Sequence, residues 1–286
     1  MRPFEYIKPT TTDEAARFLA SNEDTLVIGG GTAAIVLLHL GVLRPQYVMD
    51  LGGIDALRAT SNNGSLRIGA LTRIRTLERS ADLARTHALL AEAAAQVANV
   101  RVRNIATVGG AVAYGEPQTD TPVALTALRA SVEITSAGGT RNVPIADFYR
   151  GPYETVLEQG ELVTAIDVPT LAPNSTGCHI KFTIGSPENK PVANVSAMLT
   201  IDPASGKCTD ATLVLGAVGP KPVVATASNG LIGETLTPEL FTAIALQAAD
   251  ETDPIEDLRG PVWYKRRIAK VLVERALTCA QQKTQG

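Results

Sequence analysis

Two short glycine-rich segments, far apart in the sequence, place the strongest constraint on how this chain can fold. The first, GGGTA at Gly29 to Ala33, follows the apolar segment Thr25 to Ile28 and precedes apolar residues at helical spacing. The second, TVGGA, spans Thr107 to Ala111. Glycine permits positive φ and lets backbone amides approach a phosphate without interference from a Cβ. Each segment is therefore a candidate phosphate-binding turn.

The first segment also fits the G-x-G-x-x-A pattern of a Rossmann nucleotide site, and Asp50 lies about 20 residues later, where such a site places a ribose-binding acid. Three features argue against that interpretation. A helical segment precedes the first strand, residues 51 to 170 show no strand–helix alternation, and the second glycine segment needs its own explanation. A Rossmann site, another kind of dinucleotide cradle and purely structural glycines all remain open at this point.

Composition narrows the class of protein. The 286 residues are 45% hydrophobic and 19% charged with a net charge of −3, which is typical of a soluble globular protein and unlike a nucleic-acid-binding one. The N-terminal residues lack the apolar core of a signal peptide, and the apolar stretch Ala33 to Leu43 is too short to span a bilayer. We expect a soluble cytoplasmic protein without a transmembrane segment.

The three cysteines and three histidines do not suggest catalysis by this chain. Cys178, Cys208 and Cys279 are far apart and form no CxxC pair, so an iron–sulfur or zinc site is not expected, and each is predicted to be a small buried thiol. No nucleophile arrangement is recognisable, so no catalytic residue and no metal ligand is predicted. Two histidines are expected in helices and one at the start of a strand, in packing or surface roles, namely His39, His87 and His179.

The remaining pattern predicts an α+β protein. Strands and helices follow one another without a repeat, a hairpin is expected around Gly138-Gly139, and turns are expected at Asn62 to Gly64 and at Pro203 to Gly206. The predicted helices are 12–20, 33–40, 77–85, 87–97, 123–128, 238–250 and 261–281, and the predicted strands are 25–28, 47–51, 65–71 and 161–169.

At the two glycine segments, and over nearly its full length, the chain resembles the FAD-binding medium subunit of the xanthine dehydrogenase and carbon monoxide dehydrogenase family of molybdenum hydroxylases. The resemblance depends on the order and spacing of several segments. They are PFEYIKPTTTDEA, IGGGT, RPQYVMDL, LRIGALT, RVRNIATVGG with a downstream Asp-x-Pro, FYRGPYETVLEQGELVTAIDVP and YKRRIAKVLVERAL.

The resemblance implies a two-subdomain FAD-binding fold of the vanillyl-alcohol-oxidase (PCMH) type, followed by a C-terminal α+β domain of the CO dehydrogenase flavoprotein type. The expected boundaries are 1–58 and 59–170 for the two FAD-binding subdomains and 175–286 for the C-terminal domain. Both glycine turns are expected to contact the FAD diphosphate through backbone amides, aided by the hydroxyls of Thr32 and Thr107.

The family motifs map onto specific residues of this sequence. Asp120 matches an acid that accepts hydrogen bonds from the ribityl chain, although it could instead cap a helix. The cofactor-binding residues expected by this match are Ile28, Gly29, Gly30, Gly31, Thr32, Ala33, Thr107, Val108, Gly109, Gly110, Ala111, Tyr114, Asp120, Val163 and Lys181.

The sequence also departs from the family pattern. Ala111 stands where the family commonly has Asn or Asp, and Ala33 where it often has Ser or Asp. In SPENKPVANVSA, the residues Glu188, Asn189 and Lys190 compete for the positions of an acid and a ring-covering side chain beside the flavin. This substitution bears on which electron acceptor can dock.

By resemblance, the chain is an oxidoreductase subunit that binds FAD non-covalently and relays electrons. A large molybdopterin-binding subunit and a small subunit with [2Fe-2S] clusters are the implied partners, assembled as a dimer of heterotrimers. The terminal acceptor could be NAD, quinone, oxygen or another molecule. Two alternatives remain, namely a free-standing NAD(P)-dependent reductase and a scaffold subunit that has lost FAD.

Overall fold

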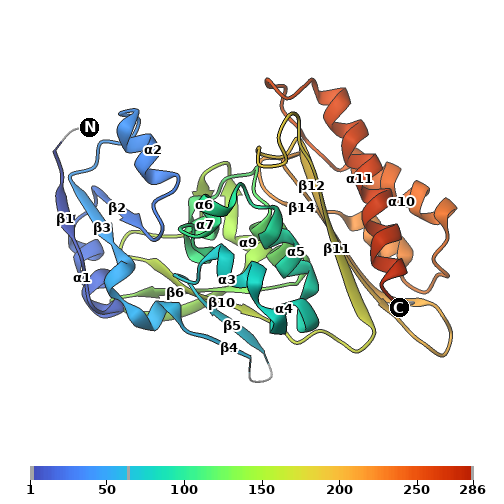
Figure 1. Ribbon diagram of the computed structural model, residues 1–286, viewed down its shortest axis with the longest axis horizontal. Coiled ribbons are helices and arrows are strands. Elements are labelled where there is room, and N and C mark those ends of the chain that lie inside the picture. Colours follow the sequence, from blue (N-terminus) through green and yellow to red (C-terminus); the bar gives the residue numbers. More distant parts are fainter. Residues whose placement is uncertain (1–2, 63–64, 285–286) are drawn as a thin grey trace.

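Three units, each built on its own β-sheet, lie in a row along the long axis of the molecule (Figure 1). The computed structural model describes residues 3–62 and 65–284. The sheets fall within residues 5–50, 60–168 and 175–224. The domain boundaries expected from the sequence follow the same order but remain predictions.

The N-terminal unit is a three-stranded parallel sheet in the order β1-β3-β2. Helix α1 packs on one face, and it begins after Thr11, whose side chain accepts a hydrogen bond from the amide of Glu14 at 3.1 Å. The elements of this unit are β1 (Glu5–Ile7), α1 (Thr12–Ser21), β2 (Thr25–Ile28), α2 (Ala34–His39), β3 (Tyr47–Asp50), η1 (Leu51–Gly53) and η2 (Asp55–Arg58).

The sheet of the second unit has the order β4-β5-β10-β6-β7, and all its pairs are antiparallel. The β2–α2–β3 unit is therefore not extended into a doubly wound parallel sheet, and the Rossmann interpretation is wrong for this fold.

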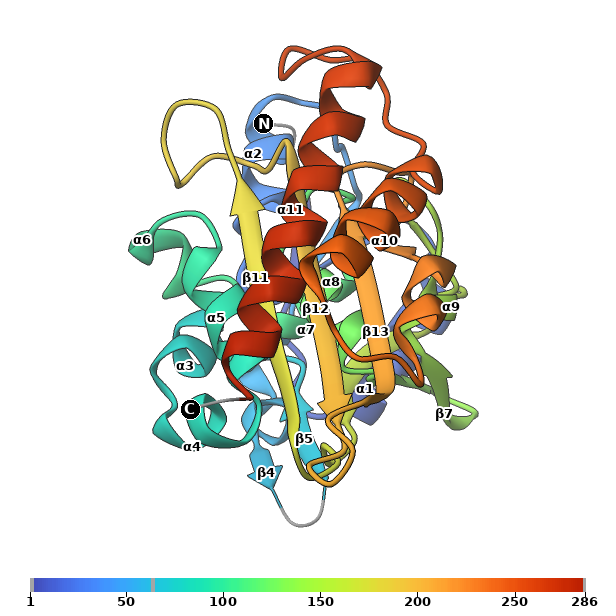
Figure 2. The same cartoon turned by 90° about the vertical axis from the view of Figure 1, so that its right-hand side faces the viewer.

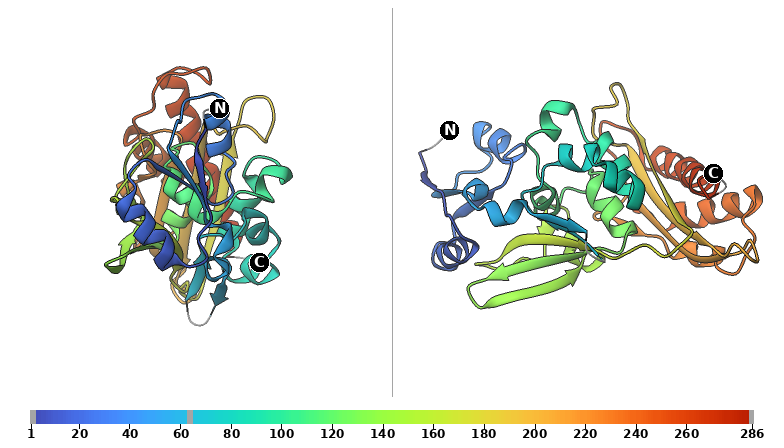
Figure 3. Two further views of the ribbon diagram at one scale, coloured as in Figure 1. Left: turned by 90° about the vertical axis from the view of Figure 1, so that its left-hand side faces the viewer. Right: turned by 60° about the horizontal axis from the view of Figure 1, so that its bottom comes forward.

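Helices of the second unit cover one face of its sheet, and the other face stays open (Figure 3). Leu90, Val108 and Leu125 from three helices pack with Ile68 and Ile166 of the sheet in the largest core cluster. The elements are β4 (Thr60–Asn62), β5 (Leu66–Gly69), α3 (Ile74–Arg79), α4 (Ala81–Thr86), α5 (Ala88–Gln96), α6 (Val100–Arg103), α7 (Val108–Tyr114), α8 (Thr121–Ala127), β6 (Ser131–Ser136), β7 (Gly139–Pro144), α9 (Ile145–Phe148), β8 (Tyr149–Gly151), β9 (Glu154–Thr155) and β10 (Leu162–Val168).

Some local predictions for this unit are wrong. The single helix expected from Leu77 to Arg85 is two helices, because Ser80 is extended and its hydroxyl accepts from the amide of Leu83, which starts α4. His87 lies between two helices rather than within one. Of the turn expected at Asn62 to Gly64, residues 63 and 64 lie outside the described residues.

The C-terminal unit is an antiparallel sheet in the order β11-β12-β13-β14. Helices α10 and α11 pack on its outer face (Figure 2), whereas α5 and α8 of the second unit contact its inner side. The elements are β11 (Ser175–Phe182), β12 (Ala193–Ile201), β13 (Cys208–Gly216), β14 (Val223–Val224), η3 (Thr226–Leu231), α10 (Pro238–Asp250) and α11 (Val262–Gln282).

Two of the cysteines form a disulfide, which corrects the expectation of three separate thiols. Cys178 of β11 bonds to Cys279 of α11 across 101 residues of sequence, and Cys208 is the free, buried thiol. The pairing could not be read from the sequence because the two positions meet only when α11 packs on the sheet. The bond ties the last helix to the strand that also carries His179 and Lys181.

Within residues 3–62 and 65–284, no helix is both long and apolar enough to cross a membrane.

Candidate cofactor site

The first glycine turn connects β2 to α2 at the carboxyl end of the parallel sheet. Gly31 has a φ of 71°, a left-handed conformation that suits glycine. Within the described part of the chain, the amides of residues 30 to 33 donate no hydrogen bond to a protein acceptor. Consecutive amides free of protein acceptors in such a turn are a concave anion-binding feature.

The second glycine turn starts α7. Thr107 is the N-cap, and its hydroxyl oxygen accepts from the amide of Gly110 at 3.2 Å. The amides of Val108 and Gly109 donate to Thr72 and Ala70, and the amide of Ala111 donates to Thr107. The four amides of residues 108 to 111 are thus engaged within the chain. This result differs from the expectation that they would face the phosphates, because the turn uses them to start a helix and join the sheet.

The two turns are in direct contact. A Cβ on Gly30 would lie 2.0 Å from the carbonyl oxygen of Ile105, and one on Gly29 would lie 2.6 Å from the hydroxyl oxygen of Thr107. Side chains at these positions would push the turns apart. The second turn therefore contributes the Thr107 side chain and a close-fitting wall, and the free amides come from the first turn.

Helix α7 leads away from this contact, rising about 10 Å over its seven residues. It ends at Tyr114, whose ring packs edge-on against Tyr153 with centroids 5.1 Å apart. The next turn contains Glu116, a buried carboxylate that accepts from the ammonium of Lys190 at 2.5 Å. Burial is the main reason that the pKa of Tyr153 is raised, and the charge of Glu116 adds to it.

Asp120 lies at the centre of a buried polar cluster. Its carboxylate accepts from Lys181 Nζ at 2.9 Å and from Asn194 Nδ2 at 2.8 Å, and it lies 3.4 Å from His179 Nε2. Burial would raise the pKa of this carboxyl, but the His179 hydrogen bond and the charge of Lys181 outweigh it, and the pKa is lowered. Asp120 precedes α8 without capping it through its side chain, so the alternative role as a helix cap is wrong.

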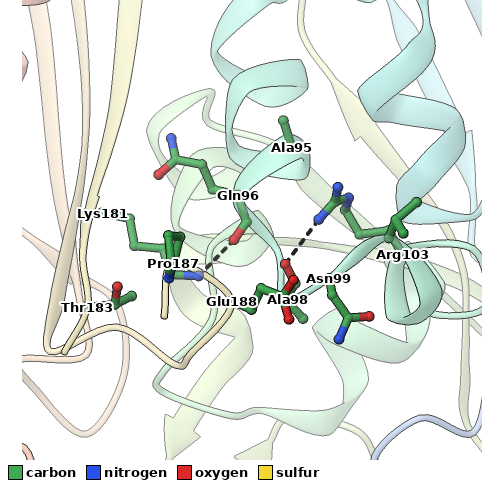
Figure 4. A pocket seen from close by; sticks show the side chains of 10 residues that line it. Ala95, Gln96, Ala98, Asn99, Arg103, Lys181, Thr183, Pro187 and Glu188 are labelled. Atoms are coloured by element: carbon green, nitrogen blue, oxygen red, sulfur yellow. Dashed lines mark hydrogen bonds between the residues drawn. The ribbon is translucent and has the colours of Figure 1, made fainter. Parts of the chain in front are cut away.

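A cavity of 480 Å³ opens beside this cluster, between the second unit and the C-terminal unit. The side chain of Lys181 forms part of the cavity wall, and its ammonium donates a hydrogen bond to the carbonyl of Gln96 at 2.7 Å (Figure 4). The guanidinium of Arg103 donates hydrogen bonds to the carbonyls of Val97 and Ala98, and Ala98 has a positive φ of 39°. The lining residues are Ala95, Gln96, Ala98, Asn99, Val100, Arg103, Lys181, Thr183, Pro187 and Glu188.

The structure thus brings together Gly29 and Gly30 with Thr107, and Asp120 with Lys181. Ile28 ends β2, directly before the first turn. Val163 is a buried core residue of β10 that pairs with Ile134 of β6 beside a bulge. Sequence reasoning did not identify the close approach of Ile105, the lining residues from Ala95 to Arg103, or the roles of His179, Ser196 and Asn194. The segment RVRNIATVGG was the available signal for the first two.

Among the described residues, no group of three or more His, Cys, Asp or Glu side chains is placed to hold a metal ion.

Comparisons with known proteins agree with this geometry. Residues 2–171 match the family described as FAD binding domain in molybdopterin dehydrogenase, and residues 188–280 match the CO dehydrogenase flavoprotein C-terminal domain. By its fold and these matches, the chain is an FAD-binding flavoprotein subunit of an oxidoreductase. It belongs to the FAD-binding medium subunits of the carbon monoxide dehydrogenase and xanthine dehydrogenase family of molybdenum hydroxylases.

Individual relatives cover almost the whole chain. The glyceraldehyde dehydrogenase medium chain of Sulfolobus acidocaldarius is 35% identical over 96% of both chains. The carbon monoxide dehydrogenase medium chain of Afipia carboxidovorans is 32% identical over 99% of this chain and 98% of that one. A solved carbon monoxide dehydrogenase from Hydrogenophaga pseudoflava superposes with a TM-score of 0.94 at 31% identity, covering 98% of each chain. The family and the fold predicted from the sequence are confirmed.

Proposed function

We propose that the chain binds one FAD non-covalently, with its diphosphate against the first glycine turn and its flavin at the cavity beside Lys181. The observation that carries this proposal is the contact between the two turns, which sets four free amides beside Thr107. Amides that lack acceptors fit an anionic diphosphate. Helix α7 runs from that point to Tyr114, so an extended cofactor can follow it toward the Asp120 cluster.

The residues expected from the family motif have defined tasks in this proposal. Gly30, Gly31, Thr32 and Ala33 donate to the diphosphate, and the Thr107 hydroxyl adds a donor. Gly109 is required for packing, since a Cβ there would lie 2.5 Å from the Cβ of Ala70. Val108 and Val163 belong to the buried core and can only support the site from behind. The remaining predicted contacts line the proposed path of the cofactor, and they are those of Ile28, Gly29, Gly110, Ala111, Tyr114, Asp120 and Lys181.

In the assembled enzyme, we infer that the chain passes electrons between partners. FAD accepts electrons singly or in pairs and can release them either way. The proposed donor is a [2Fe-2S] subunit, which receives electrons from a large molybdopterin-binding subunit, in a dimer of heterotrimers. The names of the relatives support a multisubunit assembly, since they are medium chains or subunits of dehydrogenase complexes. The terminal acceptor would dock near Lys190, where the sequence departs from its family.

Gly110→Asp tests the cofactor proposal. Gly110 is exposed, and a Cβ there would lie 2.8 Å from the Thr107 hydroxyl oxygen, so an aspartate must displace that capping side chain and also places negative charge at the proposed diphosphate site. We expect the purified wild-type chain to absorb at about 450 nm and the variant to lose that absorbance while it remains folded, with a fall in melting temperature no larger than the loss of one helix cap produces. Full flavin occupancy in the variant would refute the placement of the second turn. A wild-type chain that binds a nicotinamide cofactor instead, or no cofactor after gentle purification, would favour the reductase or the scaffold alternative.

A further inference from the structure

Five buried polar residues connect the core of the C-terminal unit to the cavity. The register of β11 and β12 pairs His179 with Ser196 and Lys181 with Asn194, so these four residues lie at alternate positions of two neighbouring strands, on the same face of the sheet. Asp120, from the second unit, inserts between them. The side chains of His179 and Asp120 are 0% and 4% exposed, and that of Lys181 is 5% exposed. Of the five, Lys181 is the one that lines the cavity.

Hydrogen bonding orients the ring of His179 between Ser196 and Asp120. The Ser196 hydroxyl lies 2.8 Å from Nδ1, and the Asp120 carboxylate lies 3.4 Å from Nε2. An ionised carboxylate can only accept, so Nε2 carries a proton directed at Asp120, while Nδ1 contacts the Ser196 hydroxyl. Asp120 and Lys181 are an anion and a cation in direct contact within this buried site.

Asn194 completes the arrangement. It is fully buried, and its Nδ2 donates to both the carbonyl of Thr119 and the carboxylate of Asp120 at 2.8 Å. Asp120 is thereby fixed from three directions, and one of its oxygens is aimed at Lys181. The carbonyl of Gln96 is the second acceptor for the Lys181 ammonium. Any movement of Asp120 would therefore move the ammonium on the cavity wall.

We propose that His179, oriented by Ser196, is a positioning residue that acts through Asp120 to set where Lys181 presents its charge to the flavin. This inference rests on the proposed function, because it requires the flavin to occupy the cavity. A cation at that wall stabilises negative charge on a reduced flavin. His179 does not touch the cofactor and affects it only through the Asp120–Lys181 pair.

The test measures FAD affinity and the midpoint potential of bound flavin in single and double variants. Lys181→Met should lower the potential and weaken FAD binding about tenfold, the loss expected of one charge-assisted contact. His179→Leu should change both quantities in the same direction but less. His179→Gln, which keeps a donor near the position of Nε2, should restore values within about twofold of wild type. In a Lys181→Met background, His179→Leu should have no further effect on potential, because the two act in series.

Two matched variants separate positioning from general destabilisation. His87→Gln alters another buried histidine, which bonds to Thr86 and Pro169 away from the cavity, and should leave the potential unchanged. Ser196→Ala should reproduce part of the effect of His179→Leu on the potential. If His179→Leu does not fold, Ser196→Ala and His179→Gln still test the positioning role through the same two measurements. Melting temperatures of the cofactor-free proteins report the structural cost of each change.

The possible failures are distinguishable. If the wild-type chain binds no FAD, the proposed function fails. If it binds FAD but His179→Leu leaves the potential and affinity unchanged, or lowers the potential equally with and without Lys181, the positioning role is wrong.

Discussion

The α-carbon of Gly30 lies so close to the carbonyl oxygen of Ile105 that an added Cβ would approach it to 2.0 Å. These residues belong to different units, one to the turn after β2 and the other to the segment before α7. Their contact joins the N-terminal parallel sheet to the antiparallel unit at the point where the diphosphate is proposed to bind. The need for glycine at this position therefore comes from the meeting of two turns as well as from access for a ligand.

Gly30→Ala should separate the two turns. The backbone atoms of Ile105 cannot rotate away as a side chain would, so the turns must move and the free amides lose their arrangement. We expect FAD affinity to fall at least tenfold, with a smaller loss of stability, measured by equilibrium titration of the cofactor-free chain and by thermal melting. Gly138→Ala, in the β6–β7 hairpin, is the control because its Cβ would meet its nearest neighbour at 3.7 Å. Unchanged affinity in Gly30→Ala would contradict the contact.

Asp120→Asn should destabilise the chain by about 3 to 5 kcal/mol, because it leaves the buried ammonium of Lys181 without its counter-charge. Denaturant unfolding of the cofactor-free protein measures this loss. Asp210→Asn is a matched control, since Asp210 pairs with Arg129 on the surface and that exposed pair contributes at most about 1 kcal/mol. Equal losses of unfolding free energy in both variants would show that the buried Asp120 cluster stabilises the chain no more than an exposed ion pair does.

The same variant should change the acid dependence of stability. The pKa of Asp120 is lowered in the folded chain, so its ionised form contributes stability at neutral pH. That contribution is lost as pH falls from about 3.9, the pKa of an aspartate in the unfolded chain, through the lower pKa of Asp120 in the folded chain. The difference in unfolding free energy between wild type and Asp120→Asn should therefore narrow below about pH 4. A gap that stays constant between pH 7 and about 3 would contradict a lowered pKa.

Removing the disulfide should loosen the C-terminal helix. Cys178→Ala should lower the unfolding free energy by about 2 to 5 kcal/mol, because the bond closes a loop of 101 residues in the unfolded chain. Thiol titration of the denatured protein should find one free thiol before reduction, at Cys208, and three after it. Cys208→Ala removes a buried thiol without touching the bond and controls for packing. Three free thiols before reduction would refute the pairing.

Glu116→Gln should lower the pKa of Tyr153. Burial is the largest cause of the raised pKa of this phenol, and the charge and hydrogen bonding of Glu116 are the next. Loss of the negative charge should move the phenol toward its ordinary value, which ultraviolet titration measures. The pKa of Tyr149 is raised by burial alone, so its titration should not respond. An unchanged pKa of Tyr153 in Glu116→Gln would show that Glu116 does not act on this phenol.

The sequence by itself determined the family, the α+β class, the two glycine turns and most of the elements. Those features depend on local patterns, such as capping side chains at 11–13, the turn at Pro203 to Gly206 between β12 and β13, or glycines between a strand and a helix. Local competition between backbone and side chain produced the errors, as at Ser80, where a hydroxyl bond to the chain starts a new helix.

Only the tertiary structure decided which groups meet. Gly30 touches Ile105, Cys178 reaches Cys279, and Asp120 enters between His179 and Lys181 because separate units pack together. Such contacts depend on the relative positions of whole sheets and helices, which no spacing within a short segment encodes. For the same reason, the sequence indicated amides in both turns, but the fold engages those of the second turn internally and leaves those of the first free.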